Sequence, residues 1–247
     1  MKPIIKVLLF TLTVVVFIQC EKEYPNENWV PGGYWYDSRD GNSYATIPIG
    51  DQVWMAENMA YLPSVSNEEN GSEDEGNESL AFYYVLGYDG TSVSAAKADS
   101  NYKKYGVLYN WNAALEACPN GWHLPSDNEW TELEIYLGGS DTAGVKLKAT
   151  WGWDFNKWRD SYGNGTNESG FTALPGGSRF IDYQDPLLNT YDFSGSGFFG
   201  GWWSASEMHT QNEETFVYYR YLMYSHDKVW KDESLNHEAH SVRCIKD

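Results

Sequence analysis

The stretch that decides the fold is Cys118-Pro119-Asn120-Gly121-Trp122-His123-Leu124-Pro125-Ser126. Its last residue begins a capping box, because this serine is followed three residues later by Glu129. An apolar series at helical spacing comes next, from Trp130 to Leu137. We therefore expect a helix after Ser126 that ends at the pair Gly138-Gly139.

The segments on both sides of this stretch are rich in predicted strands. Residues 44–49 and 52–56 are β-rich runs separated by Gly50-Asp51, which predicts a hairpin. Residues 109–117 permit one short helix. Short aromatic strands follow at residues 200–204, 216–224 and 241–245, and the last of these closes the fold. Two short helices within a strand-rich chain indicate an α+β domain.

The N-terminal segment has the pattern of an export signal. The basic residues Lys2 and Lys6 precede an apolar run over residues 7–18. As a helix this run would rise only about 18 Å. That is short of the roughly 30 Å hydrocarbon core of a membrane. We therefore expect a signal peptide at residues 1–19 rather than a transmembrane span.

Cys20 follows the apolar run and precedes a polar segment, which resembles a lipoprotein signal. In such signals the cysteine becomes the mature N-terminus and carries acyl chains that hold the protein to a membrane. The acidic Glu21-Lys22-Glu23 also resembles the surface-export signals of Bacteroidota lipoproteins. We expect lipidation at Cys20, a polar linker at residues 20–37, and an outer-membrane or cell-surface location after export through the inner membrane. Residues 17–19 depart from the usual lipobox, so an uncleaved anchor and plain secretion stay open.

The chain is strongly acidic, with 35 Asp and Glu against 17 Lys and Arg and a formal net charge of −18. Such a charge repels phosphates. Nucleic-acid affinity comes largely from basic side chains that displace counterions, so we expect no nucleic-acid partner. An acidic surface that keeps an exposed protein soluble is the simpler interpretation.

The chain has three cysteines. If Cys20 is lipidated, Cys118 and Cys244 remain as a pair in an oxidising compartment, which predicts a disulfide. In the simple model, closing a loop of about 125 residues removes roughly 5 kcal/mol of unfolded-chain entropy as an upper limit.

An ordered set of motifs runs through the chain. It comprises Asp40-Gly41-Asn42, Ile49-Gly50-Asp51-Gln52-Val53-Trp54-Met55-Ala56-Glu57-Asn58, Tyr105-Gly106-Val107-Leu108-Tyr109-Asn110-Trp111, the Cys118 stretch, Gly170-Phe171-Thr172-Ala173-Leu174-Pro175-Gly176-Gly177, Trp202-Trp203-Ser204 and Ser241-Val242-Arg243-Cys244. Together these motifs resemble the Fibrobacter succinogenes major paralogous domain family, over residues 38–247.

This resemblance implies a fold and a setting more than a reaction. The implied fold is C-type-lectin-like, a small α+β domain with two short helices, short twisted antiparallel strands and a long-range disulfide. The disulfide joins the first helix region to the last strand, which is where Cys118 and Cys244 lie.

Several chemistries can be weighed against the sequence. The calcium-binding triplets Glu-Pro-Asn, Gln-Pro-Asp and Trp-Asn-Asp of C-type lectins do not occur, so we expect no metal and no cofactor. The related formylglycine-generating enzymes need reactive cysteines. A thiolate at Cys118 with His123 as base is conceivable on spacing, but the disulfide is the stronger expectation. His237 and His240 lack the zinc-protease spacing and are expected on a solvent-facing loop.

The tryptophans are the remaining lead, since the chain has twelve. Those inside the motifs are expected in the core: Trp54, Trp111, Trp122, Trp130, Trp202 and Trp203. Trp151, Trp153 and Trp158 instead cluster in a polar segment, where flat side chains can stack on sugar rings or anchor a protein partner. We take these three as candidate ligand contacts, with core burial as the alternative.

These observations favour a surface-exposed, non-enzymatic binding or adhesion module for a glycan or protein ligand, held to a membrane by its lipid. One alternative is an enzyme of the formylglycine-generating type or a glycan-active hydrolase, which would need a free thiol or a carboxylate pair in a cleft. Another is a structural envelope protein without a small ligand.

Overall fold

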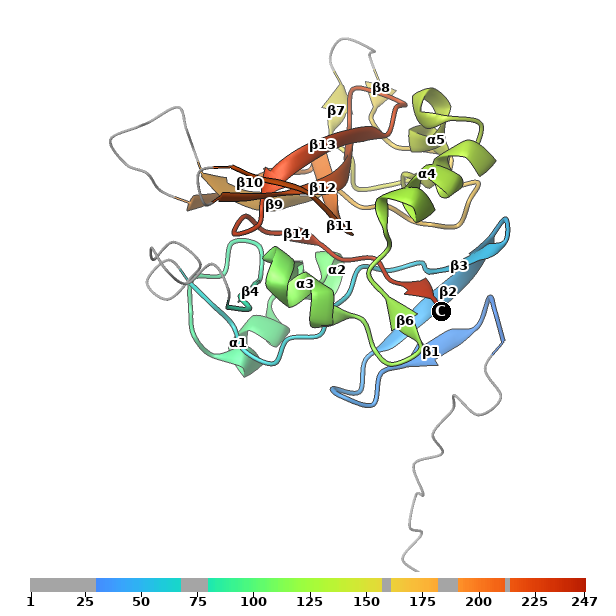
Figure 1. Cartoon of the computed structure of the whole chain (residues 1–247). Coiled ribbons are helices and arrows are strands. Elements are labelled where there is room, and N and C mark those ends of the chain that lie inside the picture. The colour runs from blue at the N-terminus through green and yellow to red at the C-terminus, as the bar shows by residue number, and fades with distance from the viewer. Residues whose placement is uncertain (1–29, 68–79, 157–160, 182–190, 212–213) are drawn as a thin grey trace, which may run out of the picture.

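The computed structural model describes residues 30–67, 80–156, 161–181, 191–211 and 214–247. Within these residues the chain is a mixed α and β structure made mostly of strands, with a few short helices (Figure 1). The predicted signal peptide, Cys20 and Trp158 lie outside the described residues.

The first sheet has five strands in the order β1-β2-β3-β15-β6 among the described residues (Figure 1). They are β1 (Tyr34–Tyr36), β2 (Ser43–Ile49), β3 (Gln52–Met55), β15 (Ile245–Lys246) and β6 (Trp122–His123). The hairpin of β2 and β3 forms as predicted, because Gly50 takes the positive φ of 62° that glycine adopts freely. β1 pairs with β2 although it falls in the expected linker, so ordered structure begins before residue 38.

The second sheet has eight strands in the described part of the chain. Six follow the order β10-β9-β11-β14-β5-β4, and β12 and β13 extend from β11. They are β4 (Tyr83–Tyr84), β5 (Leu108–Tyr109), β9 (Gly176–Ile181), β10 (Tyr191–Ser196), β11 (Phe199–Gln211), β12 (Glu214–Met223), β13 (Trp230–Leu235) and β14 (His240–Ser241). A separate pair is formed by β7 (Phe155–Asn156) and β8 (Ser161–Tyr162).

The prediction of one closing strand over residues 241–245 is wrong. β14 belongs to the second sheet, and β15 belongs to the first. Residues 242–244 carry the chain between the two sheets. Their carbonyls still accept backbone hydrogen bonds, since Met59 donates to Val242 and Met55 donates to Cys244, both at 2.9 Å. The prediction of strands near the C-terminus is therefore confirmed, but the run contains two short strands that belong to different sheets.

Five helices are present among the described residues, where the sequence predicts two. They are α1 (Val93–Ala98), α2 (Ser100–Tyr105), α3 (Trp111–Ala117), α4 (Asp127–Tyr136) and α5 (Ser140–Leu147). The capping box predicted for α4 is confirmed, with Ser126 and Glu129 bonding each other's backbone. The Gly138-Gly139 pair ends α4, and α5 begins immediately after it. None of these helices combines the length and apolarity that a membrane crossing requires.

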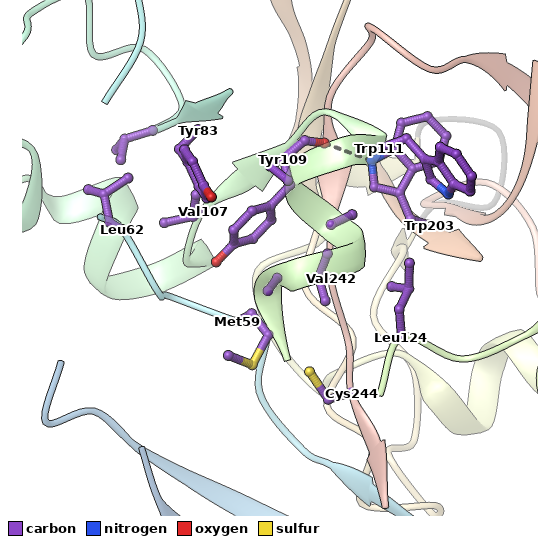
Figure 2. Close-up of a cluster of buried hydrophobic side chains, with 14 of the residues drawn as sticks. Met59, Leu62, Tyr83, Val107, Tyr109, Trp111, Leu124, Trp203, Val242 and Cys244 are labelled. Carbon is purple, nitrogen blue, oxygen red and sulfur yellow. Dashed lines mark hydrogen bonds between the residues drawn. The ribbon is translucent and has the colours of Figure 1, made fainter. Parts of the chain in front are cut away.

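One core cluster lies between α3, the β4–β5 strands and the segment that joins β14 to β15 (Figure 2). Trp203 belongs to this cluster, and its Nε1 donates to the carbonyl of Tyr109 at 2.7 Å (Figure 2). The predicted disulfide is confirmed, since Cys118 at the end of α3 is bonded to Cys244 across 126 residues. The bridge thus fastens this core to the segment that crosses between the sheets.

A second core cluster lies beneath α4 and α5. Its centre is aromatic: Trp54 lies 4.9 Å from Trp130 and 5.7 Å from Phe171 between ring centroids. Phe171 also meets Trp202 edge to face at 6.3 Å. All six tryptophans expected in the core are buried, which confirms that prediction. Rings in such tilted and edge-to-face contacts add about 0.5–1.5 kcal/mol per pair beyond their burial.

Candidate ligand-binding site

A cavity of about 450 Å³ opens where four separate parts of the chain meet. We call it the Trp151 pocket. The segment after β3 contributes Glu57 and Asn58, the last turn of α2 contributes Lys104, and two later loops contribute Trp151 and Thr172. The pocket combines an aromatic face with charged and amide groups, which is the composition expected of a small-ligand site.

Trp151 supplies the aromatic face. It follows α5 in a loop, and 49 % of its surface is exposed although it is a large apolar side chain. Just before it, Lys148 forms a β-bridge with Ala173, which fixes where the loop leaves the core. The sequence prediction that this tryptophan can contact a ligand is therefore compatible with its position.

Trp153 lies two residues further on and points the other way. Only 2 % of it is exposed, and its Nε1 donates to the carbonyl of Ala173 at 3.1 Å. The ammonium of Lys148 lies 5.3 Å from its ring centroid. Its indole thus belongs to the core, so its place among the candidate ligand contacts is corrected. The physical reason is that a short turn at Gly152 separates an outward from an inward side chain.

The floor of the pocket is built around the amide of Asn58. Its Oδ1 accepts hydrogen bonds from Trp202 Nε1 at 2.9 Å and from Arg243 Nη2 at 2.8 Å. Its Nδ2 donates to the carbonyl of Tyr105 at 3.0 Å and to Ser241 Oγ at 3.2 Å. These bonds tie α2, β11 and the β14–β15 segment to one side chain, so the floor is rigid.

Arg243 lies directly behind Asn58 with 1 % of its surface exposed. Besides Asn58, its guanidinium donates to the carbonyls of Met55 and Phe171. The guanidinium carbon also lies 4.2 Å from the ring centroid of Phe171. Burial lowers the pKa of Arg243 to about 9, and the charge of Glu57 opposes that shift. The side chain is therefore still cationic at neutral pH.

Thr172 borders the pocket in a backbone conformation that β-branched residues rarely adopt, with φ at 57°. Asn167, also at positive φ, holds it there. The side-chain oxygen of Asn167 accepts from the Thr172 backbone at 2.8 Å, and its nitrogen donates to Thr172 Oγ1 at 3.0 Å. Strain of this kind costs about 1–3 kcal/mol and gathers at functional sites.

A comparison with protein families shows which family the chain belongs to. The model of the Fibrobacter succinogenes major domain matches residues 47–246. The chain belongs to this family. No match is found among curated proteins, and none is found among solved structures.

Half of the residues that line the pocket lie within the family motifs of this sequence. Glu57, Asn58 and Thr172 line the cavity and occur in the stretches that suggested the family, as does Arg243 behind Asn58, but their meeting in space has no local signature. Lys104 lies outside those stretches, and nothing in the sequence singles it out. The burial of Arg243 has no local signature either, because successive side chains of an extended segment alternate between its two faces.

The thiolate alternative for the family fold is not compatible with this structure. Cys118 is bonded to Cys244 and has no free sulfur. The proposed base His123 instead lies between two carboxylates, with Nδ1 at 2.7 Å from Asp247 and Nε2 at 2.8 Å from Glu129. Burial opposes its protonation, but these hydrogen bonds outweigh that effect and raise its pKa. His123 thus links α4 to Asp247.

The expectation that His237 and His240 lie on a solvent-facing loop is wrong. Both are buried, and the ring of His240 stacks on Tyr219 at 4.4 Å. Ser234 Oγ lies 2.9 Å from His240 Nε2. Burial lowers the pKa of His240 to about 3, so the ring is neutral and belongs to the core. Across the described residues, no group of three or more His, Cys, Asp or Glu side chains is arranged to hold a metal ion.

Proposed function

We propose that this chain is a non-enzymatic binding or adhesion module that takes a glycan in the Trp151 pocket. The observation that carries the proposal is the exposed indole of Trp151 on the wall of a cavity with charged and polar groups around it. An aromatic face packs against the C–H face of a sugar ring, while polar groups around it bond the hydroxyls. The volume of about 450 Å³ is within the range of small-ligand pockets.

The rigidity of the floor supports binding without large rearrangement. Asn58 is fixed by bonds to Trp202, Arg243, Tyr105 and Ser241. A ligand that meets a preorganised floor loses less free energy to ordering the protein.

The setting that we propose is the outer membrane or cell surface, with the acyl chains of a lipidated Cys20 as anchor. The N-terminal apolar run and the cysteine after it support this assignment. We also propose a C-type-lectin-like scaffold. Its supports are the mixed α and β architecture and the disulfide that joins the end of α3 to the segment before β15.

The carboxylates around the pocket favour binding over hydrolysis. Glycoside hydrolases use a pair of carboxyl groups that flank the scissile bond. Among the described residues that line the Trp151 pocket, Glu57 alone carries a carboxylate. A hydrolase would therefore need its second carboxyl group from elsewhere.

A glycan array tests the proposal on the full chain in detergent, with hits titrated by tryptophan fluorescence. Saturable binding that is lost in Trp151→Ala is the expected result, since that change removes the exposed indole. Tyr136→Ala serves as the matched control, because Tyr136 is also an exposed aromatic but lies outside this pocket. The absence of glycan binding, or equal losses in both variants, would contradict the proposal.

A further inference from the structure

The charges around the Trp151 pocket are opposite in sign to those of the whole chain. The chain has a formal net charge of −18. The described residues that line the pocket include two lysines, Lys103 and Lys104, and one carboxylate, Glu57. Arg243 adds a buried cation behind the floor. A local positive field inside an acidic protein attracts anions to that place.

Lys104 has no ion-pair partner among the described residues. Its ammonium lies 4.6 Å from the ring centroid of Tyr105 and 5.9 Å from that of Trp151. Its neighbour Lys103 instead donates to the carbonyl of Ala98 at 2.9 Å. Elsewhere lysines do find carboxylates, as Lys231 does with Asp127 at 2.9 Å. Lys104 therefore keeps its hydrogen-bond donors available at the rim of the cavity.

Arg243 strengthens the same field from below. Its acceptors are neutral oxygens of Asn58, Met55 and Phe171, and no carboxylate of the described chain forms an ion pair with it. Because a buried charge is weakly screened, an anion placed above Asn58 gains from this cation. Glu57 opposes the effect, but its side chain is exposed and screened by water.

We infer that the Trp151 pocket selects acidic sugars, whose ring stacks on Trp151 while a carboxylate or sulfate group pairs with Lys104. This inference rests on the glycan-binding function proposed above. The ammonium lies over the Trp151 ring at 5.9 Å from its centroid, so a stacked sugar ring displaces the flexible lysine to its edge, where the lysine meets the substituents of that ring. The anionic group supplies the carboxylate or sulfate partner that the described chain does not give to Lys104.

The test compares matched pairs of glycans on the full chain in detergent. Oligogalacturonate is paired with its methyl ester, sialylated glycans with their desialylated forms, and sulfated galactans with their desulfated forms. We expect the acidic member of a pair to bind about tenfold more tightly, as for a hydrogen bond to a charged group. Ester and sulfate arms identify whether the recognised group is a carboxylate or a sulfate.

Variants of Lys104 test whether this lysine causes the preference for acidic glycans. Lys104→Gln should abolish the preference while the neutral member of each pair binds as before, and Lys104→Arg should retain it. Lys228→Gln is the control, because it removes the same charge at an exposed lysine outside the pocket. Equal binding of both members, or an unchanged preference in Lys104→Gln, would overturn the inference. If neutral glycans bind through Trp151 without any preference, the proposed function stands and only the acidic selectivity falls; if no glycan binds, both fall.

Discussion

Replacing Cys118 and Cys244 together by alanine removes the covalent link between the end of α3 and the segment that crosses between the two sheets. The bridge closes a loop spanning 126 residues. In the chain-entropy model, opening such a loop lowers the free energy of unfolding by about 5 kcal/mol at 25 °C. Domains of this kind have total stabilities of about 5–15 kcal/mol. The double substitution therefore removes a third or more of the free energy of unfolding.

Urea unfolding followed by tryptophan fluorescence measures this loss, with the wild type under reducing conditions as a second form that lacks the bridge. The unfolded chain without the bridge is more extended, so the denaturant slope m should also rise. The double variant avoids the free thiol that either single variant would leave. A loss below about 1 kcal/mol, with m unchanged, would refute the reasoning from loop entropy.

Two further predictions concern the start of α4. Ser126→Ala removes the capping box, so the free energy of unfolding should fall by about 1 kcal/mol. Ser206→Ala is the control, because Ser206 accepts a hydrogen bond from the backbone of Asp127 but is not part of the capping box. Its loss should be smaller. Because the folded pKa of His123 is raised, its contribution to stability is present below the unfolded pKa of about 6.5 and is lost as pH rises through the folded value. The melting temperature of His123→Gln should therefore fall below that of the wild type at about pH 5.5 and approach it at about pH 8.5. A constant difference across that range would contradict the ion-pair assignment.

The sequence predicted correctly those structural elements that depend on interactions within a few residues. The Gly50-Asp51 turn and the Ser126 capping box each act within a few residues, and both occur in the structure. The pairing of Cys118 with Cys244 followed from counting and from redox compartment rather than from geometry. Aromatic residues inside the motifs could be assigned to the core because large apolar rings are costly to expose.

The missed helices differ in their local signals, since α1 and α2 have side-chain caps at Ser92 and Asp99 but are only six residues long, whereas α5 has no such cap. The N-cap residue of α5 is Gly139, which has no side chain to cap the helix, and α5 contains Gly144, so its sequence gives a weak helix signal. Gly144 is required there because a Cβ would approach the carbonyl oxygen of Asp227 to 2.5 Å, which is a contact from a distant segment. The pocket was missed for the same reason, since Asn58, Lys104 and Trp151 meet only through tertiary packing.

The position of residues 240–246 has a consequence for the order in which the chain can fold. β14 lies between β11 and β5, and β15 lies between β3 and β6, so each is an inner strand of its sheet. Both come later in the chain than every strand they pair with. A ribosome delivers the chain from its N-terminus. Each sheet therefore lacks an inner strand until these residues emerge from the ribosome. A nascent chain that stops short of them has unpaired strand edges where each sheet should be continuous.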